Sequence, residues 1–313
     1  MERWVDKHIP DMTGKRILIT GGASGIGLET AKVLAAKSAQ IIIADRDEDA
    51  GHRAVSQINA AATANLAEFR RVDLSSLSMV RRFATDVLEV GKPIDVLVNN
   101  AGIQPISERR TSGDGFELTF AIGHLAHFTL SALLFPLLKS APAGRVVTVS
   151  SLVHGQGRLD WEDLQMEKGY RAQRAYNQTK LANLLFAREL QKRLDSVGSN
   201  VQSIAVHPGV ARTSIGANRK QLGKFGFGDY LVSGVLKVVM PYLGQSAAAG
   251  ALPTIYGAAA AQAKGGGFYG PGGFGEMKGL PAAAKIKPSG QDMEAAQKLW
   301  RVSEDLTGAS FIV

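Results

Sequence analysis

The first two thirds of the chain alternate short apolar runs with longer amphipathic segments, and this alternation constrains the fold most. The runs are rich in β-branched residues and apolar at consecutive positions, which is typical of parallel strands buried on both faces. Strands of this kind separated by helices predict one doubly wound sheet. The predicted strands are 16–20, 40–44, 69–72, 94–98, 145–149 and 201–206, and the predicted helices are 25–37, 48–61, 75–90, 116–138 and 175–197.

We therefore predict an α/β fold: a single Rossmann-type, doubly wound parallel β-sheet with helices on both faces. The 313 residues suit one large α/β domain as well as two average ones. The last third has a helix near 245–256 and a glycine-rich stretch, but nothing that suggests a second core. We expect one domain over 1–313, with substrate-loop elaborations at 152–175 and 211–244.

Composition excludes several classes of site. The chain has no cysteine, which rules out disulfide scaffolds, cysteine-ligated zinc, iron–sulfur clusters and thiol nucleophiles. No histidine or carboxylate spacing is typical of a metal site, and no G-x-S-x-G elbow is present. The formal charge of +8 suits an anionic cofactor. No lysine or arginine run exceeds two residues, so we expect no nucleic-acid interface.

Three parts of the chain bear on membrane attachment. The charged residues 1–11 lack the apolar core of a secretory signal. The uncharged stretches 118–138 and 238–263 are long enough to span a bilayer, but histidines, glycines and prolines interrupt them. We expect buried helices, no transmembrane segment and a cytoplasmic protein. The apolar segment 230–243 is flanked by basic residues, so it could attach the protein to a membrane surface. A lid over the substrate is the favoured interpretation of the same segment.

A glycine-rich turn joins the first predicted strand to the first predicted helix. Its glycines have the spacing G-x-x-x-G-x-G, which permits a tight turn and lets backbone N–H groups approach a pyrophosphate at the helix N-terminus. A plain structural turn is the alternative, and the flanking strand and helix favour the phosphate site. The candidate cofactor-binding residues here are Gly21, Ser24, Gly25, Ile26 and Gly27.

The ends of the second and third strands carry acidic residues. Asp45 can accept hydrogen bonds from an adenosine ribose and would repel a 2′-phosphate, although a helix N-cap is its alternative role. Arg46, directly after it, could instead pair with that phosphate. Asp73 and Leu74 could lie against adenine. We predict NAD as the preferred cofactor, with NADP as the alternative.

Tyr176 and Lys180 stand four residues apart, so their side chains share one helix face. An ammonium beside a phenol favours the phenolate and lowers the tyrosine pKa towards working pH. A tyrosine of this kind can act as a general acid or base. Ser150 and Ser151 close the fifth strand, where a hydroxyl can point into the same crevice.

Five motifs occur in order: TGGASGIG (20–27), NNAG (99–102), VSS (149–151), YNQTK (176–180) and HPGVART (207–213). Together they resemble the short-chain dehydrogenase/reductase family over nearly the whole chain. The segments LDWEDL, KLANLLFAREL, QSAAAGALPTIY, FYGPGG and LWRVSEDLTG are similar to the branch of retinol dehydrogenases and WW-domain oxidoreductases.

The resemblance implies an oxidoreductase that transfers a hydride between a nicotinamide cofactor and a bulky or lipophilic alcohol or carbonyl compound. Tyr176 would pass the proton, Ser151 would hold the substrate oxygen, and Lys180 would bind the nicotinamide ribose. Other cofactor contacts would come from Asn99, Ala101 and Gly102 and from Pro208, Gly209, Val210 and Thr213. The substrate and the direction of the reaction are not encoded in these motifs. Family members are often dimers or tetramers built on two long helices, which makes a homodimer or homotetramer possible here, although monomers occur in this branch.

One position departs from the family. Gly123 stands where an asparagine usually links the lysine to a water. Glycine could preserve a backbone kink there or could be required for a positive φ. His124 beside it could substitute for the asparagine, although a packed core histidine is favoured. The departure also supports an alternative function, a catalytically impaired nicotinamide-binding sensor or scaffold.

Overall fold

Parallel strands buried on both faces form the centre of the protein. The computed structural model describes residues 2–61, 66–104, 107–211 and 244–312. They include an eight-stranded sheet with the order β3-β2-β1-β4-β5-β6-β7-β8, parallel except that β8 runs antiparallel to β7. The strands are β1 (Arg16–Thr20), β2 (Gln40–Asp45), β3 (Ala67–Arg71), β4 (Val96–Asn99), β5 (Arg145–Val149), β6 (Gln202–Val206), β7 (Phe268–Pro271) and β8 (Pro281–Ala283).

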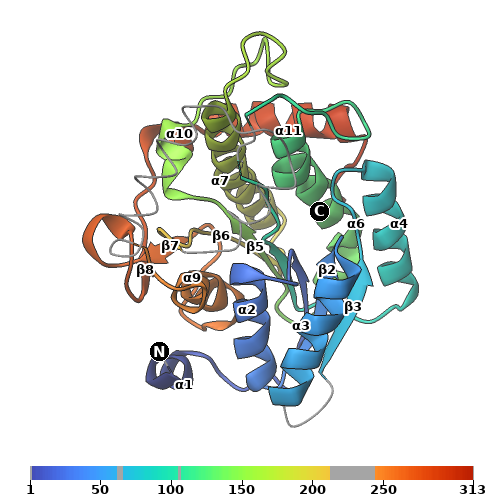
Figure 1. Ribbon diagram of the computed structural model, residues 1–313, viewed down its shortest axis with the longest axis vertical. Helices are drawn as coiled ribbons and strands as arrows, with labels where there is room; N and C mark the ends of the chain where they lie inside the picture. Colours follow the sequence, from blue (N-terminus) through green and yellow to red (C-terminus); the bar gives the residue numbers. More distant parts are fainter. Residues whose placement is uncertain (1, 62–65, 105–106, 212–243, 313) are drawn as a thin grey trace.

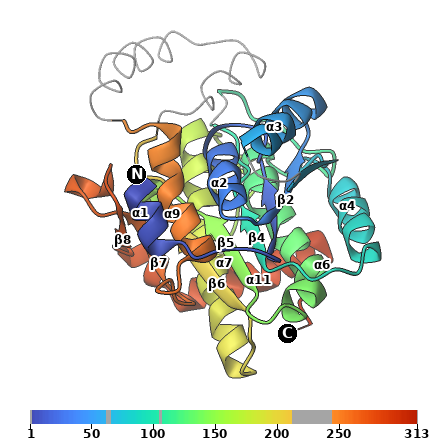
Figure 2. The same cartoon turned by 90° about the horizontal axis from the view of Figure 1, so that it is seen from below.

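Helices cover both faces of this sheet (Figure 1 and Figure 2). The described helices are α1 (Glu2–His8), α2 (Gly25–Ala36), α3 (Glu48–Ala61), α4 (Leu77–Glu89), α5 (Leu118–Phe120), α6 (Ala126–Lys139), α7 (Ala172–Ser196), α9 (Ala247–Ala259), α10 (Pro288–Gln291) and α11 (Met293–Thr307). α2, α3 and α9 pack on one face, and α4, α6 and α7 pack on the other. α11 lies on the outer side of α7.

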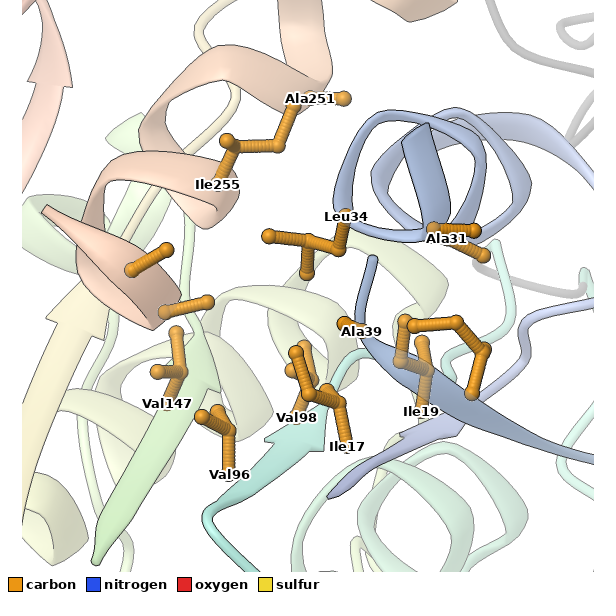
Figure 3. Close-up of a cluster of buried hydrophobic side chains, with 14 of the residues drawn as sticks. Ile17, Ile19, Ala31, Leu34, Ala39, Val96, Val98, Val147, Ala251 and Ile255 are labelled. Atoms are coloured by element: carbon orange, nitrogen blue, oxygen red, sulfur yellow. The ribbon is translucent and has the colours of Figure 1, made fainter. Parts of the chain in front are cut away.

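Alternating side chains of β1 show how both faces are filled. Ile17 and Ile19 lie in the core with Leu34 of α2 and Ile255 of α9, as Figure 3 shows, and all four are fully buried. Leu18, between them, is equally buried on the opposite face. The two-residue period of a strand therefore places consecutive apolar residues in two separate cores.

The predicted fold class is confirmed. The central strand β4 begins two residues later than predicted, and the other main differences lie at the edges of the sheet. β3 begins two residues before the predicted run and has only half-buried and exposed residues, because it is an edge strand. The last third, predicted as an elaboration, contributes β7 and the antiparallel β8, so the sheet is not wholly parallel. Most of the predicted substrate loop 211–244 lies outside the described residues.

The predicted helix 116–138 is continuous from Leu118 to Lys139 but contains a π-helical turn, Ala121–Leu125. By length and composition it could cross a membrane, yet 89% of its most apolar window is buried inside the protein. Its burial between the sheet and neighbouring helices supports its reading as a core helix. The corresponding judgement on 238–263 falls partly on residues that are not described.

Strand order positions the site. From β1 the chain proceeds outward through β2 to β3 and then returns to β4 on the other side of β1. Loops therefore diverge above the carboxyl ends of β1 and β4, which leaves a crevice in a doubly wound sheet.

Candidate active site

Glycines shape the turn between β1 and α2. Gly21 and Gly25 have φ values of +64° and +56°, a region that disfavours other residues. A Cβ at Gly27 would lie 2.3 Å from the carbonyl oxygen of Gly21, so a larger residue would displace the turn. The N-cap residue Ser24 makes no side-chain cap bond. The Ser24 hydroxyl therefore leaves the first N–H groups of α2 uncapped. An anion-binding helix N-terminus requires such uncapped N–H groups.

Asp45 joins the end of β2 to this turn. Its Oδ2 accepts a hydrogen bond from the N–H of Ala23 (3.3 Å), and its Oδ1 accepts from the N–H groups of Arg46 (2.8 Å) and Asp47 (3.3 Å). The carboxylate is half-buried and lines the cavity described below. It does not cap a helix; that position is taken by Asp47, which accepts from Ala50 N–H.

The end of β4 supplies the opposite wall, through a different asparagine from the predicted one. Asn99 is buried and donates to the hydroxyl of Ser131, away from the cavity. Asn100 lines the cavity and donates from its amide to the carbonyl oxygens of Thr20 (2.8 Å) and Gly21 (3.2 Å). Alternation of side chains at the strand end sends the two asparagines in opposite directions.

Ser151, Tyr176 and Lys180 meet where β5 ends beside the start of α7. Tyr176 forms a side-chain hydrogen bond with Ser151. The Lys180 Nζ lies 5.6 Å from the centre of the Tyr176 ring and donates to the carbonyl of Val149 at 3.1 Å. The hydroxyl of Ser150 donates to the carbonyl of Lys180 at 2.6 Å, which ties β5 to α7.

Burial dominates the electrostatics of this group. It raises the pKa of the Tyr176 phenol, and the hydrogen bond with Ser151 opposes that rise. Burial also lowers the pKa of Lys180 to about 8. The predicted lowering of the tyrosine pKa by the lysine is therefore not the net effect in the chain alone, because removing the phenol from water outweighs the opposing hydrogen bond.

The loop after β6 approaches the site from the other side. Pro208 lines the cavity, and Gly209 has φ +62°. A Cβ on Gly209 would lie 2.4 Å from the carbonyl oxygen of Met277, which accepts the N–H of Val210 at 2.9 Å. Gly209 and Val210 support the loop without lining the cavity, and Thr213 lies outside the described residues.

A cavity of about 390 Å³ runs between these elements. Most of the predicted cofactor residues line it: Gly21, Ser24, Gly25, Ile26, Asp45, Arg46, Asp73, Leu74, Ala101, Gly102, Tyr176, Lys180 and Pro208. Gly27, Asn99 and Ser151 are not among the lining residues. Of the two serines expected at the end of the fifth strand, Ser150 lines the cavity. The sequence did not single out other lining residues such as Asn100, Val149 and Ile122, which adjoin predicted motifs or the departure at 123 and carry no separate chemical signal.

The lining fits an elongated anionic dinucleotide. Gly102 and Lys180 both line the cavity, and a Cβ at Gly102 would stand 3.7 Å from the Lys180 Nζ, at van der Waals distance. The uncapped N-terminus of α2 lies among the same lining residues as the carboxylate of Asp45. Among the described residues, no group of three histidine, aspartate or glutamate side chains is placed to hold a metal ion.

Comparison with known proteins identifies this arrangement. A family model described as short chain dehydrogenase matches residues 15–222. The chain belongs to the short-chain dehydrogenase family. As a member of this family, the protein is an oxidoreductase that uses a nicotinamide cofactor on an alcohol/carbonyl pair.

Individual proteins similar to this chain support the same family assignment. Retinol dehydrogenase 12 of Mus musculus is 36% identical over 296 residues, which cover 94% of this chain and 87% of the relative. Polyprenol dehydrogenase of Mus musculus is 36% identical over 313 residues, which cover 96% of this chain and 86% of the relative. The crystal structure of an uncharacterized protein from Mycobacterium paratuberculosis has a TM-score of 0.79 at 36% identity and covers 97% of both chains.

Gly123, the residue that departs from this family's pattern, lies in the π turn of the long helix. The expected backbone irregularity is present as this turn, but the φ of Gly123 is not positive, so the explanation by a positive φ is wrong. A Cβ at this position would instead lie 2.5 Å from the Cγ2 of Thr179, so α7 packs where a side chain would be. His124 does not replace the missing asparagine: it is buried, and its Nε2 is hydrogen-bonded to Ser303 at 2.9 Å.

This packing predicts that Gly123→Asn destabilises the protein by about 1–3 kcal/mol through overpacking. Thr179→Ser removes the obstructing methyl group and keeps the hydroxyl that donates to Ala175. Urea unfolding of Gly123→Asn, with and without Thr179→Ser, should show most of the loss restored in the double variant. Equal losses in the two backgrounds would mean that Thr179 is not the obstacle.

Desolvation of Lys180 predicts a pH-dependent stability. Because its pKa is about 8 in the folded chain and about 10.4 when unfolded, the cost of burying the ammonium is complete below pH 8 and disappears as the pH rises through 10.4. Lys180→Met should therefore raise the free energy of unfolding at pH 7 by as much as about 3 kcal/mol.

The gain from Lys180→Met should shrink between pH 8 and pH 10.4. Denaturant unfolding at pH 7, 9 and 10.4 measures it, with the exposed Lys192→Met on the same helix as the control. A methionine variant that is less stable at pH 7, or a gain that does not change with pH, would contradict the burial cost.

Proposed function

We propose that this protein oxidises or reduces a bulky, lipophilic alcohol or carbonyl compound, with Tyr176 as the general acid or base. The observation that carries the proposal is that Tyr176, which interacts with Ser151, lines one cavity together with Lys180, the glycine-rich turn and Asp45. Relatives named for retinol and polyprenol, both long apolar alcohols, support the substrate class.

In this reaction Tyr176 transfers the proton at its phenolic oxygen. Ser151, already hydrogen-bonded to Tyr176, holds the substrate oxygen beside that phenol. Lys180 stays close to the ring and contributes positive charge that favours the phenolate when the proton leaves. The nicotinamide ring supplies or accepts the hydride when the cofactor is bound.

The impaired-sensor alternative depended on Gly123 alone, and no described contact favours it. The π turn is retained without the asparagine side chain, and the three residues of the proposed proton transfer remain together. The cytoplasmic location expected from the sequence stays a prediction, and the segment 230–243 lies outside the described residues.

Tyr176→Phe should lower kcat about 10²–10⁴-fold, the usual contribution of a positioned acid or base. Cofactor affinity should stay nearly unchanged, because only the phenolic oxygen is removed. Steady-state kinetics on a secondary alcohol, combined with fluorescence titration of the dinucleotide, measures both quantities. Tyr256→Phe, on α9 and outside the cavity lining, is the matched control. Retained turnover in Tyr176→Phe would remove the tyrosine from the mechanism.

We propose NAD as the preferred cofactor. Asp45 lines the cavity, and its negative charge would repel the 2′-phosphate of NADP. Three backbone N–H groups donate to the carboxylate and hold it in place: one from Ala23 in the glycine-rich turn, and two from Arg46 and Asp47 after β2. Arg46, which is exposed, also lines the cavity and is the counter-argument.

Asp45→Asn should shift the ratio of kcat/KM for NAD and NADP towards NADP by about 1–3 kcal/mol. Asparagine removes the charge while keeping an acceptor oxygen for the turn, so the shift reports charge rather than collapse of the loop. The ratio is measured on one substrate, with Asp49→Asn on α3 as a control outside the cavity lining. An unchanged ratio would place Asp45 away from the ribose.

We also propose that the protein is a single-domain monomer. Trp300 of α11 is buried against Phe128 of α6 and Phe186 of α7, with ring centres 5.2 and 6.0 Å apart. α11 thereby covers the two long helices on which other family members dimerise, and β8 covers the outer edge of β7. Light scattering at micromolar concentration should give the mass of one chain. A mass of two or four chains would contradict the proposal.

A further inference from the structure

The His127 ring lies between the π turn of the long helix and the end of β1. It lies on α6, one turn after Gly123, and its side chain is fully buried. One ring nitrogen, Nδ1, lies 3.1 Å from the carbonyl oxygen of Gly123 in the π turn. The other, Nε2, lies 2.9 Å from the hydroxyl oxygen of Thr20 at the end of β1.

The hydroxyl of Thr20 is also an acceptor for the cavity wall. The backbone N–H groups of Asn100 and Ala101 approach its oxygen at 3.0 and 3.1 Å. A hydroxyl has two acceptor sites and one donor. With both acceptor sites filled by these N–H groups, the Thr20 hydroxyl must donate its hydrogen, and the histidine Nε2 at 2.9 Å is closer than the alternative acceptor, the Val98 carbonyl at 3.3 Å.

These contacts determine the protonation state of the ring. A carbonyl oxygen only accepts, so Nδ1 must carry a hydrogen to bond Gly123. Nε2 must carry none, because a hydrogen there would meet a hydroxyl oxygen with no free acceptor site. Burial, with a smaller contribution from the charge of Lys180, lowers the pKa of His127 to about 4, although the bond to Gly123 acts in the opposite direction. The ring is therefore neutral with its hydrogen on Nδ1.

We propose that His127, as the neutral Nδ1–H tautomer, is a positioning residue of the cofactor site: it orients the Thr20 hydroxyl that holds the N–H groups of Asn100 and Ala101 in the cavity wall. Ala101 and Gly102 form the wall next to Lys180. The π turn, where this chain lacks the family's asparagine, is joined to the cofactor wall by the same ring. His127 is not part of the proton-transfer group, and in this role it touches neither substrate nor cofactor.

The tautomer is tested directly by ¹⁵N NMR of the imidazoles in the wild-type protein at pH 7. The His127 signals, assigned by their loss in His127→Gln, should show a protonated Nδ1 and an unprotonated Nε2. Free histidine prefers the opposite tautomer, and the hydrogen bonds made by each nitrogen decide which one is populated. An Nε2–H tautomer or a doubly protonated ring would overturn the proposal.

The positioning role is tested by three substitutions that separate the two bonds. His127→Gln places an amide oxygen near the position of Nε2 and retains an acceptor for Thr20. His127→Asn places an amide donor near the position of Nδ1 and retains only the bond to Gly123. His127→Leu removes both. Dissociation constants of the dinucleotide, from fluorescence titration without substrate, should rise about tenfold in the asparagine and leucine variants, as expected for one lost hydrogen bond.

The glutamine variant should bind the dinucleotide within about threefold of the wild type, a difference too small for a lost hydrogen bond. Thermal unfolding separates positioning from simple stability, since asparagine and glutamine should lower the melting temperature by similar amounts. Equal cofactor affinity in the glutamine and asparagine variants would overturn the role of the Thr20 bond. If His127→Leu does not fold, the difference in cofactor affinity between the glutamine and asparagine variants and the NMR measurement of the tautomer still test the proposal. Because no turnover is measured, failure here leaves the role proposed for Tyr176 standing.

Discussion

The ends of β1 and β4 are held together by hydrogen bonds from the Asn100 amide to the carbonyls of Thr20 and Gly21. These bonds need a backbone approach so close that a Cβ at Gly27 would stand 2.7 Å from the same amide nitrogen. The crevice above the sheet exists because the strands diverge in order at this point. The bonds convert that topological gap into two fixed walls, one formed by the glycine-rich turn and the other by the residues after β4. The remaining parts of the site are built on these walls.

Burial is the second constraint, and it acts against stability while serving the chemistry. Lys180 and Tyr176 both pack in a region where the charged form of each is disfavoured. The ammonium is satisfied by a single described protein acceptor, the Val149 carbonyl, which also accepts from the amide of Asn183 at 3.1 Å. A bound dinucleotide would offer the lysine further polar partners. Strain of this kind at a site, offset by the apolar cores on both faces of the sheet, is common where proteins trade stability for activity.

Much of this arrangement follows from sequence, because local patterns encode it. The strand–turn–helix at 16–27 is visible in β-branched residues, glycine spacing and helix periodicity, and Tyr176 and Lys180 share a helix face by spacing alone. Contacts between distant segments are not encoded in this way. Which of Asn99 and Asn100 enters the cavity depends on where β4 ends, and the reason for glycine at 123 is a methyl group on α7. The direction of β8 depends on its pairing with β7, since its sequence, PAA, has no pattern that distinguishes parallel from antiparallel.

The central claim is that the cavity holds a nicotinamide dinucleotide beside a substrate carbonyl, with the hydride passing directly between them. Transfer of isotope tests it most directly. The purified protein is incubated with a long-chain aldehyde such as retinal and reduced dinucleotide deuterated on either face of the nicotinamide C4, and the alcohol is analysed by mass spectrometry. The account predicts one deuterium on the carbinol carbon from one of the two labelled faces only. Alcohol formed without deuterium from either face, or no alcohol from any lipophilic carbonyl tested with either cofactor, would contradict it.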